Sequence, residues 1–220
     1  ILAFTFGYTM IMAETSLGRM TKKSPVGAYQ SFGKSKWLSL GGWINAIIPI
    51  LIVPYYSVIG GWVIKYLIGY FSGQAQTLAS DTYFSAFISN GASTEICFIV
   101  FTFCTLGIIY AGVQNGIERV SKFMMPVLVV LSVIIAIYSV TRPGALEGVK
   151  YFLVPNPANF SWMTVVSAMG QMFYSLSIAM GILITFGSYM KKDVSIEGST
   201  KNVEIFDTAI AIMAGLMIIP

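Results

Sequence analysis

The 220-residue chain has no histidine and only two cysteines. Without histidine it cannot form a Ser-His-Asp triad, a Cys-His pair or the common zinc sites. Cys97 and Cys104 are seven residues apart on one predicted helix, about 10 Å along its axis, which excludes a disulfide. We expect both to be buried small side chains. The chain also lacks a GxxxxGK[ST] loop and an evident nucleophile–base pair, so neither ATP use nor an enzyme is predicted.

Charge is scarce as well, since charged residues make up 10% of the chain and hydrophobic residues 56%. A soluble domain carries about 25% charged residues. The apolar residues gather in six stretches, several of them long enough to cross a bilayer. We predict an all-α transmembrane bundle and one incomplete domain over residues 1–220, because the outer stretches are cut by the chain ends. The predicted spans cover about residues 1–20, 41–71, 96–113, 123–141, 162–190 and 203–220.

The basic residues alternate from one connection to the next, so that 10 of the 13 fall in the first, third and fifth connections. The positive-inside rule places these three connections in the cytoplasm. The net charge of +4 therefore reflects topology, and no basic-aromatic pattern indicates a nucleic-acid partner. The ten residues are Arg19, Lys22, Lys23, Lys34, Lys36, Arg119, Lys122, Lys191, Lys192 and Lys201.

Two connections have a distinct character. Residues 18–40 mix basic and aromatic side chains, and either a short helix at the membrane interface, with Trp37 at headgroup depth, or a packed polar loop accounts for them. Residues 142–161 contain three prolines, which predicts an ordered but irregular segment.

The stretch 165–189 is uncharged, yet its centre is small and polar, with Gln171, Ser175 and Ser177 between Gly170 and Gly181. Unpaired polar groups are costly in hydrocarbon, so this composition needs a reason. One is a break near residues 177–181 that frees backbone groups for a ligand. The other is a small-residue face for close helix packing, and the sequence leaves both open.

Two carboxylates also lie in apolar stretches. Glu14 either pairs near Arg19 or accepts hydrogen bonds from backbone N–H groups freed by a broken helix. Asp207 is either an acid favoured by the helix dipole or an oxygen ligand for a cation, together with Ser175 if their helices are neighbours. A second break is predicted at Pro54, and the Tyr56 hydroxyl beyond it needs a partner, either a substrate carboxylate or a carbonyl.

Four motifs in this order resemble the neurotransmitter:sodium symporter family, and its bacterial amino-acid transporters in particular: Glu14-Thr-Ser-Leu-Gly-Arg19, Gly116–Lys122 with Met124-Met125-Pro126, Arg142-Pro-Gly-Ala145, and Gly170-Gln-Met-Phe-Tyr-Ser-Leu-Ser177. The resemblance covers essentially the whole chain. It implies the second to seventh helices of a leucine-transporter-type inverted-repeat fold, with a broken central helix. It also implies a multi-pass protein of a bacterial plasma (inner) membrane, with the lipid bilayer as its surroundings.

The resemblance implies a substrate pocket in which Tyr56 donates to the substrate carboxylate and Tyr174 closes the site from outside. Two positions depart from the family pattern, since Ala179 stands where glycine is usual and Met180 where an aromatic residue is usual. The visible part of the pocket carries no charge, which favours a neutral aliphatic or aromatic amino acid. The implied pocket residues are Ile52, Tyr56, Phe173, Tyr174, Ser177 and Met180.

The resemblance further implies that Ser175 and Asp207 bind a co-transported Na⁺. A carboxylate at Asp207 would replace the chloride of animal relatives, so chloride independence is expected. The predicted function is therefore sodium-coupled amino-acid symport without an organic cofactor, and a channel or a non-transporting scaffold subunit remains the alternative. The other implied roles are support of the unwound helix by Glu14 and Gly181, an anion-site counterpart at Gln171, and a cytoplasmic gate at Ser188 and Tyr189.

Overall fold

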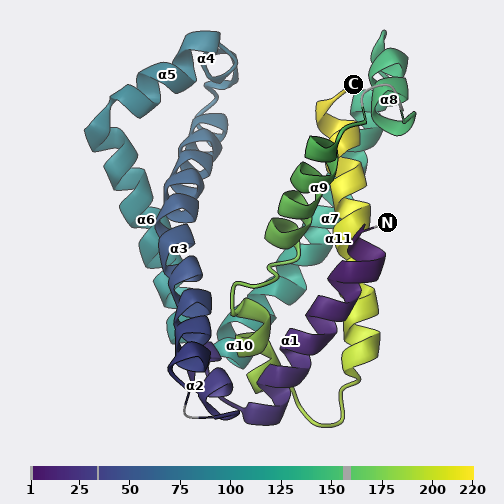
Figure 1. Cartoon of the computed structure of the whole chain (residues 1–220). Helices are drawn as coiled ribbons and strands as arrows, with labels where there is room; N and C mark the ends of the chain where they lie inside the picture. Colours follow the sequence, from purple (N-terminus) through teal and green to yellow (C-terminus); the bar gives the residue numbers. More distant parts are fainter. Residues whose placement is uncertain (1, 34, 156–159) are drawn as a thin grey trace. The chain divides into compact units, whose positions relative to one another are not determined.

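The computed structural model describes residues 2–33, 35–155 and 160–220. Among these residues every regular element is a helix, which confirms the all-α prediction (Figure 1). The chain divides into two compact units, one formed by Ile1–Pro49 with Pro126–Pro220 and the other by Ile50–Met125. The first unit holds the break predicted near residues 177–181 and both carboxylates considered above, Glu14 and Asp207.

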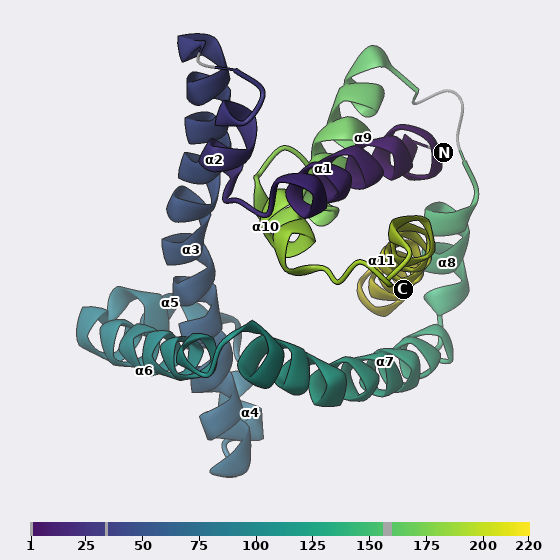
Figure 2. The ribbon, with the colours of Figure 1, turned by 90° about the horizontal axis from the view of Figure 1, so that it is seen from below.

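In the first unit, α1 packs against α10 and α11, and α11 also packs against α8. Figure 2 shows α1, α10 and α11 grouped in this way, with α11 seen end-on. A bond from Ser139 Oγ to the Met217 carbonyl oxygen (3.2 Å) ties α7 to α11. The elements that lie wholly in this unit are η1 (Ala3–Gly7), α1 (Tyr8–Thr21), α2 (Pro25–Gln30), α8 (Ala145–Leu153), α9 (Trp162–Ser175), α10 (Ile182–Tyr189) and α11 (Ile196–Ile218).

In the second unit, aromatic pairs connect α3 to α5. The rings of Trp62 and Phe84 are 5.1 Å apart and those of Tyr66 and Tyr83 are 5.6 Å apart, both edge to face. This geometry suits the ring quadrupole and adds to the apolar burial. The elements that lie in or run through this unit are α3 (Lys36–Phe71), α4 (Ala75–Leu78), α5 (Asp81–Ser89), α6 (Gly91–Tyr110), η2 (Val113–Glu118) and α7 (Arg119–Val140).

Three helical segments among the described residues are long and apolar enough to cross a membrane: Lys36–Phe71, Gly91–Tyr110 and Asn115–Val140. Only 6–11% of the residues in each of these windows are buried inside the protein, so their apolar side chains face outward, as they do in lipid. The other three predicted spans contain a π-helix, a break or several charges, and their membrane crossing remains a prediction. The first predicted span contains η1 and α1, the fifth contains α9 and α10, and the sixth contains α11.

The predicted break at Pro54 is wrong, because α3 continues through it from Lys36 to Phe71. A proline removes one backbone donor, and a long apolar helix tolerates that loss. One turn later Ser57 Oγ donates to the Val53 carbonyl oxygen at 2.9 Å, so the hydroxyl is satisfied inside the same helix.

Three further expectations are resolved by the structure. The segment after Arg142 is not irregular throughout, since Ala145–Leu153 forms α8 between the left-handed Gly144 (φ 88°) and Pro155. The prolines lie outside this run, so they bound the helix and do not prevent it. The first connection contains a short helix, α2. Cys97 is buried but Cys104 is exposed on α6, which corrects the prediction that both are buried, and both are free thiols.

The core of the first unit surrounds the segment between α9 and α10. Ile178 is 1% exposed and lies in one cluster with Ile11, Met172 and Leu176. Ile11 belongs to α1, whereas the other three residues come from the end of α9 and from the connection that follows it. Apolar burial therefore fixes the broken helix against α1, and it does so at the break itself.

Candidate functional site

The helix break lies between Ser175, where α9 ends, and Ile182, where α10 begins. It coincides with the predicted break near residues 177–181 and confirms a broken central helix. Three hydrogen bonds close the end of α9: from Leu176 N to Met172 O (3.0 Å), from Ser177 N to Tyr174 O (3.3 Å) and from Ile178 N to Phe173 O (3.0 Å). Beyond them, no described backbone N–H donates to the carbonyl oxygens of residues 176–180. The break therefore leaves a short run of backbone acceptors open.

Left-handed backbone alternates through the break. Ser177, Ala179 and Gly181 have φ values of 55°, 61° and 67°. Glycine adopts this region freely, whereas a side chain there costs about 1–2 kcal/mol. The structure thus answers the question raised by Ala179, because this alanine takes the left-handed conformation that the absent glycine would favour. Strain of this kind persists only where the surroundings hold the backbone in place.

Glu14 supplies one such restraint. Its Oε1 accepts a hydrogen bond from the Ala179 N–H at 2.7 Å, across 165 positions of sequence. Glu14 is 8% exposed, and its other oxygen, Oε2, has no partner among the described residues. Of the two interpretations of Glu14, the structure shows the bond to freed backbone. Within the described residues Arg19 instead donates to the Val194 carbonyl oxygen, at 2.5 Å.

Glycine lets α1 and α10 approach until their backbones touch. A Cβ on Gly18 would lie 3.0 Å from Ile184 Cα, and one on Gly187 would lie 3.0 Å from Thr15 Cα, with the neighbouring carbonyl oxygens closer still. Such contacts are shorter than real Cβ atoms tolerate, so these two glycines fix the spacing of the helices. The second half of the broken helix is therefore packed directly on the helix that carries Glu14.

Ser175 and Asp207 lie together at the other end of the break. Ser175 Oγ donates to Asp207 Oδ1 at 2.6 Å, which joins the end of α9 to α11. Ser175 and Asp207 can bind one cation together only if their helices are neighbours. The structure meets this requirement. A hydroxyl and a carboxylate offer oxygen ligands, which hard cations prefer. The described part of the chain contains no group of three or more His, Cys, Asp or Glu side chains suited to a metal ion, so further ligands for a cation would have to be carbonyl or other oxygens.

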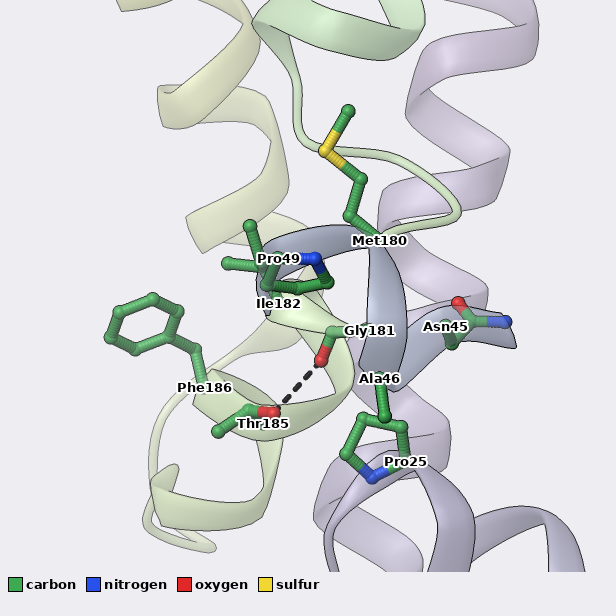
Figure 3. A pocket seen from close by; sticks show the side chains of 9 residues that line it. All are labelled: Pro25, Asn45, Ala46, Pro49, Met180, Gly181, Ile182, Thr185 and Phe186. Carbon is green, nitrogen blue, oxygen red and sulfur yellow. Dashed lines mark hydrogen bonds between the residues drawn. The ribbon is translucent and has the colours of Figure 1, made fainter. Parts of the chain in front are cut away.

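An apolar pocket of about 370 Å³ opens beside the second half of the broken helix (Figure 3). Met180, Gly181, Ile182, Thr185 and Phe186 form one wall, and none of the described residues that line the pocket is charged. Thr185 Oγ1 donates to the Gly181 carbonyl oxygen at 2.8 Å, so this hydroxyl is engaged within the wall. The opposite wall consists of Pro25, Asn45, Ala46 and Pro49.

The remaining predicted site residues are dispersed. Phe173 packs on Phe6, with ring centroids 5.8 Å apart. Tyr174 is 42% exposed, and Gln171 is exposed on the same helix. Ser188 Oγ donates to the Thr185 carbonyl oxygen at 2.7 Å, next to the exposed Tyr189 at the end of α10.

Ile52 and Tyr56 belong to the second unit, where Ile52 is half-buried and Tyr56 is 49% exposed. The structure therefore brings together Glu14 with the break and Ser175 with Asp207, both in the first unit. It also reveals a buried acid that the sequence argument passed over: Glu204, one turn before Asp207, is 3% exposed. The only sequence feature that could have indicated Glu204 is that it is a further acidic residue beside the last apolar stretch.

These features define a helical membrane protein with a broken helix, of the kind found in secondary transporters. The family model described as "Sodium:neurotransmitter symporter family" matches residues 70–220. The chain therefore belongs to the sodium:neurotransmitter symporter family. At the level of the family, the predictions of a multi-pass membrane transporter and not an enzyme are confirmed.

Relatives from several organisms align over most or all of the chain. An uncharacterized sodium-dependent transporter, YhdH, of Bacillus subtilis is 33% identical over 224 residues, which cover all of this chain and 49% of that protein. The sodium-dependent neutral amino acid transporter B(0)AT1 of Rattus norvegicus is 25% identical over 219 residues, 86% of this chain and 34% of that protein.

Among solved structures, MhsT in complex with L-phenylalanine superimposes with a TM-score of 0.89 and 34% identity, covering all of this chain and 51% of that one. The chain thus has the fold of MhsT over its whole length. It spans about half the length of the relatives YhdH and MhsT.

Proposed function

We propose that the full-length protein is a sodium-coupled symporter of a neutral amino acid with an aliphatic or aromatic side chain. The observation that carries this proposal is the bond between Ser175 Oγ and Asp207 Oδ1, placed where α9 ends and the helix opens. A hydroxyl, a carboxylate and free carbonyl oxygens side by side are the groups that a desolvated Na⁺ needs. Open backbone beside them can bind the charged ends of an amino acid.

The uncharged wall around Met180 supports a neutral substrate side chain, because a charged one would remain unpaired there. Two relatives support the same choice, since B(0)AT1 is named as a neutral amino acid transporter and MhsT was solved with L-phenylalanine. Asp207 supports chloride independence, because its carboxylate supplies the negative charge that an anion would otherwise bring next to Na⁺.

Uptake into liposomes containing the full-length protein tests the proposal. A panel of labelled amino acids is offered with an inward Na⁺ gradient, with K⁺ in its place, and with chloride replaced by gluconate. We expect saturable uptake of one or more neutral apolar amino acids that requires Na⁺ and is unchanged in gluconate. Non-saturable Na⁺ flux without amino-acid uptake would indicate a channel, and the absence of both flux and binding would indicate a scaffold.

A matched pair of tyrosine variants tests the substrate contact. The Tyr56→Phe variant removes the hydroxyl proposed to donate to the substrate carboxylate, while Tyr55→Phe removes the same group from its exposed neighbour. A hydrogen bond to a charged group contributes about 1.5–3 kcal/mol. Tyr56→Phe should therefore weaken apparent substrate affinity by about tenfold or more, with Tyr55→Phe near wild type. Equal effects of the two variants would refute the role of Tyr56.

A further inference from the structure

Glu204 is a second buried carboxylate on α11, and the function proposed above does not use it. The residue is 3% exposed, and its Oε1 receives no hydrogen bond from any described residue. It precedes Asp207 by three positions, so the two side chains lie on adjacent parts of one helix face. A carboxylate in this position needs a counter-charge or a proton.

Apolar side chains of the core lie beside the Glu204 carboxyl group. A Cβ built on Gly7 would lie 3.8 Å from Glu204 Oε1, 2.8 Å from Leu176 Cδ1 and 3.5 Å from Met172 Sδ. The carboxyl oxygen therefore shares its immediate space with the core cluster beside the helix break. The titratable or charged residues on α11 and on the helices that contact it are Tyr8, Glu14 and Arg19 (α1), Arg119, Lys122 and Tyr138 (α7), Glu147, Lys150 and Tyr151 (α8), Tyr174 (α9), and Glu197, Lys201 and Asp207 (α11).

Proton binding satisfies this geometry better than metal binding. An isolated ionised carboxylate in apolar surroundings is strongly disfavoured, and protonation removes the charge. A metal ion would need several further oxygens, and no described cluster of three metal-ligating side chains exists. We propose that Glu204 is a proton-binding site whose occupancy is linked to sodium binding at Ser175 and Asp207, an inference that rests on the proposed function.

The linkage follows from charge. With Asp207 ionised and no Na⁺ bound, a second negative charge one turn away is disfavoured, so Glu204 keeps its proton. Sodium at Asp207 removes that repulsion and favours release of the Glu204 proton. Linkage is reciprocal, so protons must in turn weaken sodium binding. Apparent sodium affinity should then rise with pH, and couplings of this kind typically amount to about 5- to 150-fold.

Equilibrium binding of ²²Na⁺ to the full-length protein, measured from pH 5.5 to 8.5, tests this site. The variants are Glu204→Gln, which mimics the protonated acid, Glu204→Asp, which keeps a titrating group, and Glu197→Gln, an exposed carboxylate on the same helix. We expect sodium affinity to rise at least about fivefold over this range in wild type, Glu204→Asp and Glu197→Gln. In Glu204→Gln the affinity should be nearly independent of pH.

Two results would overturn the inference. One is a flat wild-type profile, and the other is a Glu204→Gln variant that keeps the wild-type dependence on pH. A purely structural role for Glu204 would shift affinity by the same factor at every pH and leave the slope intact, which also counts against the proposal. The complete absence of sodium binding by the wild type at any pH would instead refute the proposed symport itself.

Discussion

Replacing Glu14 with alanine should destabilise the open backbone conformation between α9 and α10, with little change elsewhere in the structure. The variant removes the acceptor of the 2.7 Å bond from the Ala179 N–H, in a site where Glu14 is 8% exposed. Leaving a donor without its acceptor costs about 1–3 kcal/mol, and Glu14→Ala does this to the Ala179 N–H. The left-handed Ala179, already strained, would lose its restraint.

This magnitude converts directly into apparent affinity. If the open backbone is the state that binds substrate, then about 1–3 kcal/mol lowers its population by about 5- to 150-fold, and the apparent dissociation constant rises by the same factor. The Glu14→Gln variant keeps an acceptor oxygen, so its effect should be smaller. We expect the affinities to follow the order wild type, Glu14→Gln, Glu14→Ala.

The assay is equilibrium binding of a labelled amino acid to the purified full-length protein in saturating Na⁺, with thermal unfolding recorded in parallel. Glu147→Ala is the matched control, since this carboxylate is exposed on α8 and, among the described residues, no hydrogen bond or ion pair joins it to the break. A folded Glu14→Ala protein that binds substrate with wild-type affinity would refute the reasoning, because the bond would then not hold the binding state.

Two further predictions concern backbone geometry, and the melting temperature of the full-length protein checks both. Ala179→Gly should leave the melting temperature unchanged or slightly higher, because relief of the strain at φ 61° offsets the extra chain entropy of glycine. Gly181→Ala should lower the melting temperature, because φ is 67° there and the new Cβ would lie 2.6 Å from Pro25 Cγ. Gly18→Ala should destabilise strongly by forcing α1 from α10, while Gly107→Ala, with nothing within 4 Å, should be neutral or stabilise by about 0.5–1 kcal/mol. A Gly18→Ala protein as stable as Gly107→Ala would contradict the close helix contact.

The position of the break could be predicted because its signal is local. Polar and small residues in an uncharged apolar stretch, ending in Gly181, conflict with a plain spanning helix. The residues that contact the break were harder to predict from the sequence. The contacts of Glu14 with Ala179 and of Ser175 with Asp207 join positions 165 and 32 residues apart. Such contacts depend on helix packing, which one sequence leaves as a set of alternatives.

Two of the wrong predictions have a common physical cause. Proline was given too much weight, both at Pro54 inside α3 and around α8, where the helix forms between the prolines. Proline removes one donor, and the length and apolar burial of the surrounding helix decide whether it breaks. Glu204 was missed for a different reason, since no sequence pattern reveals that a side chain beside an apolar stretch is fully enclosed.

The most direct test of the account is the sodium dependence of amino-acid binding by wild type, Ser175→Ala and Ser175→Thr, using the amino acid that is taken up best. The account predicts that the wild type binds only with Na⁺. Losing the Ser175 hydroxyl should raise the half-saturating Na⁺ concentration about tenfold or more, while threonine, which keeps a hydroxyl, should stay near wild type. Binding that does not need Na⁺, or a Ser175→Ala curve that coincides with wild type, would contradict the claim that the opened helix and Asp207 form the sodium-coupled site.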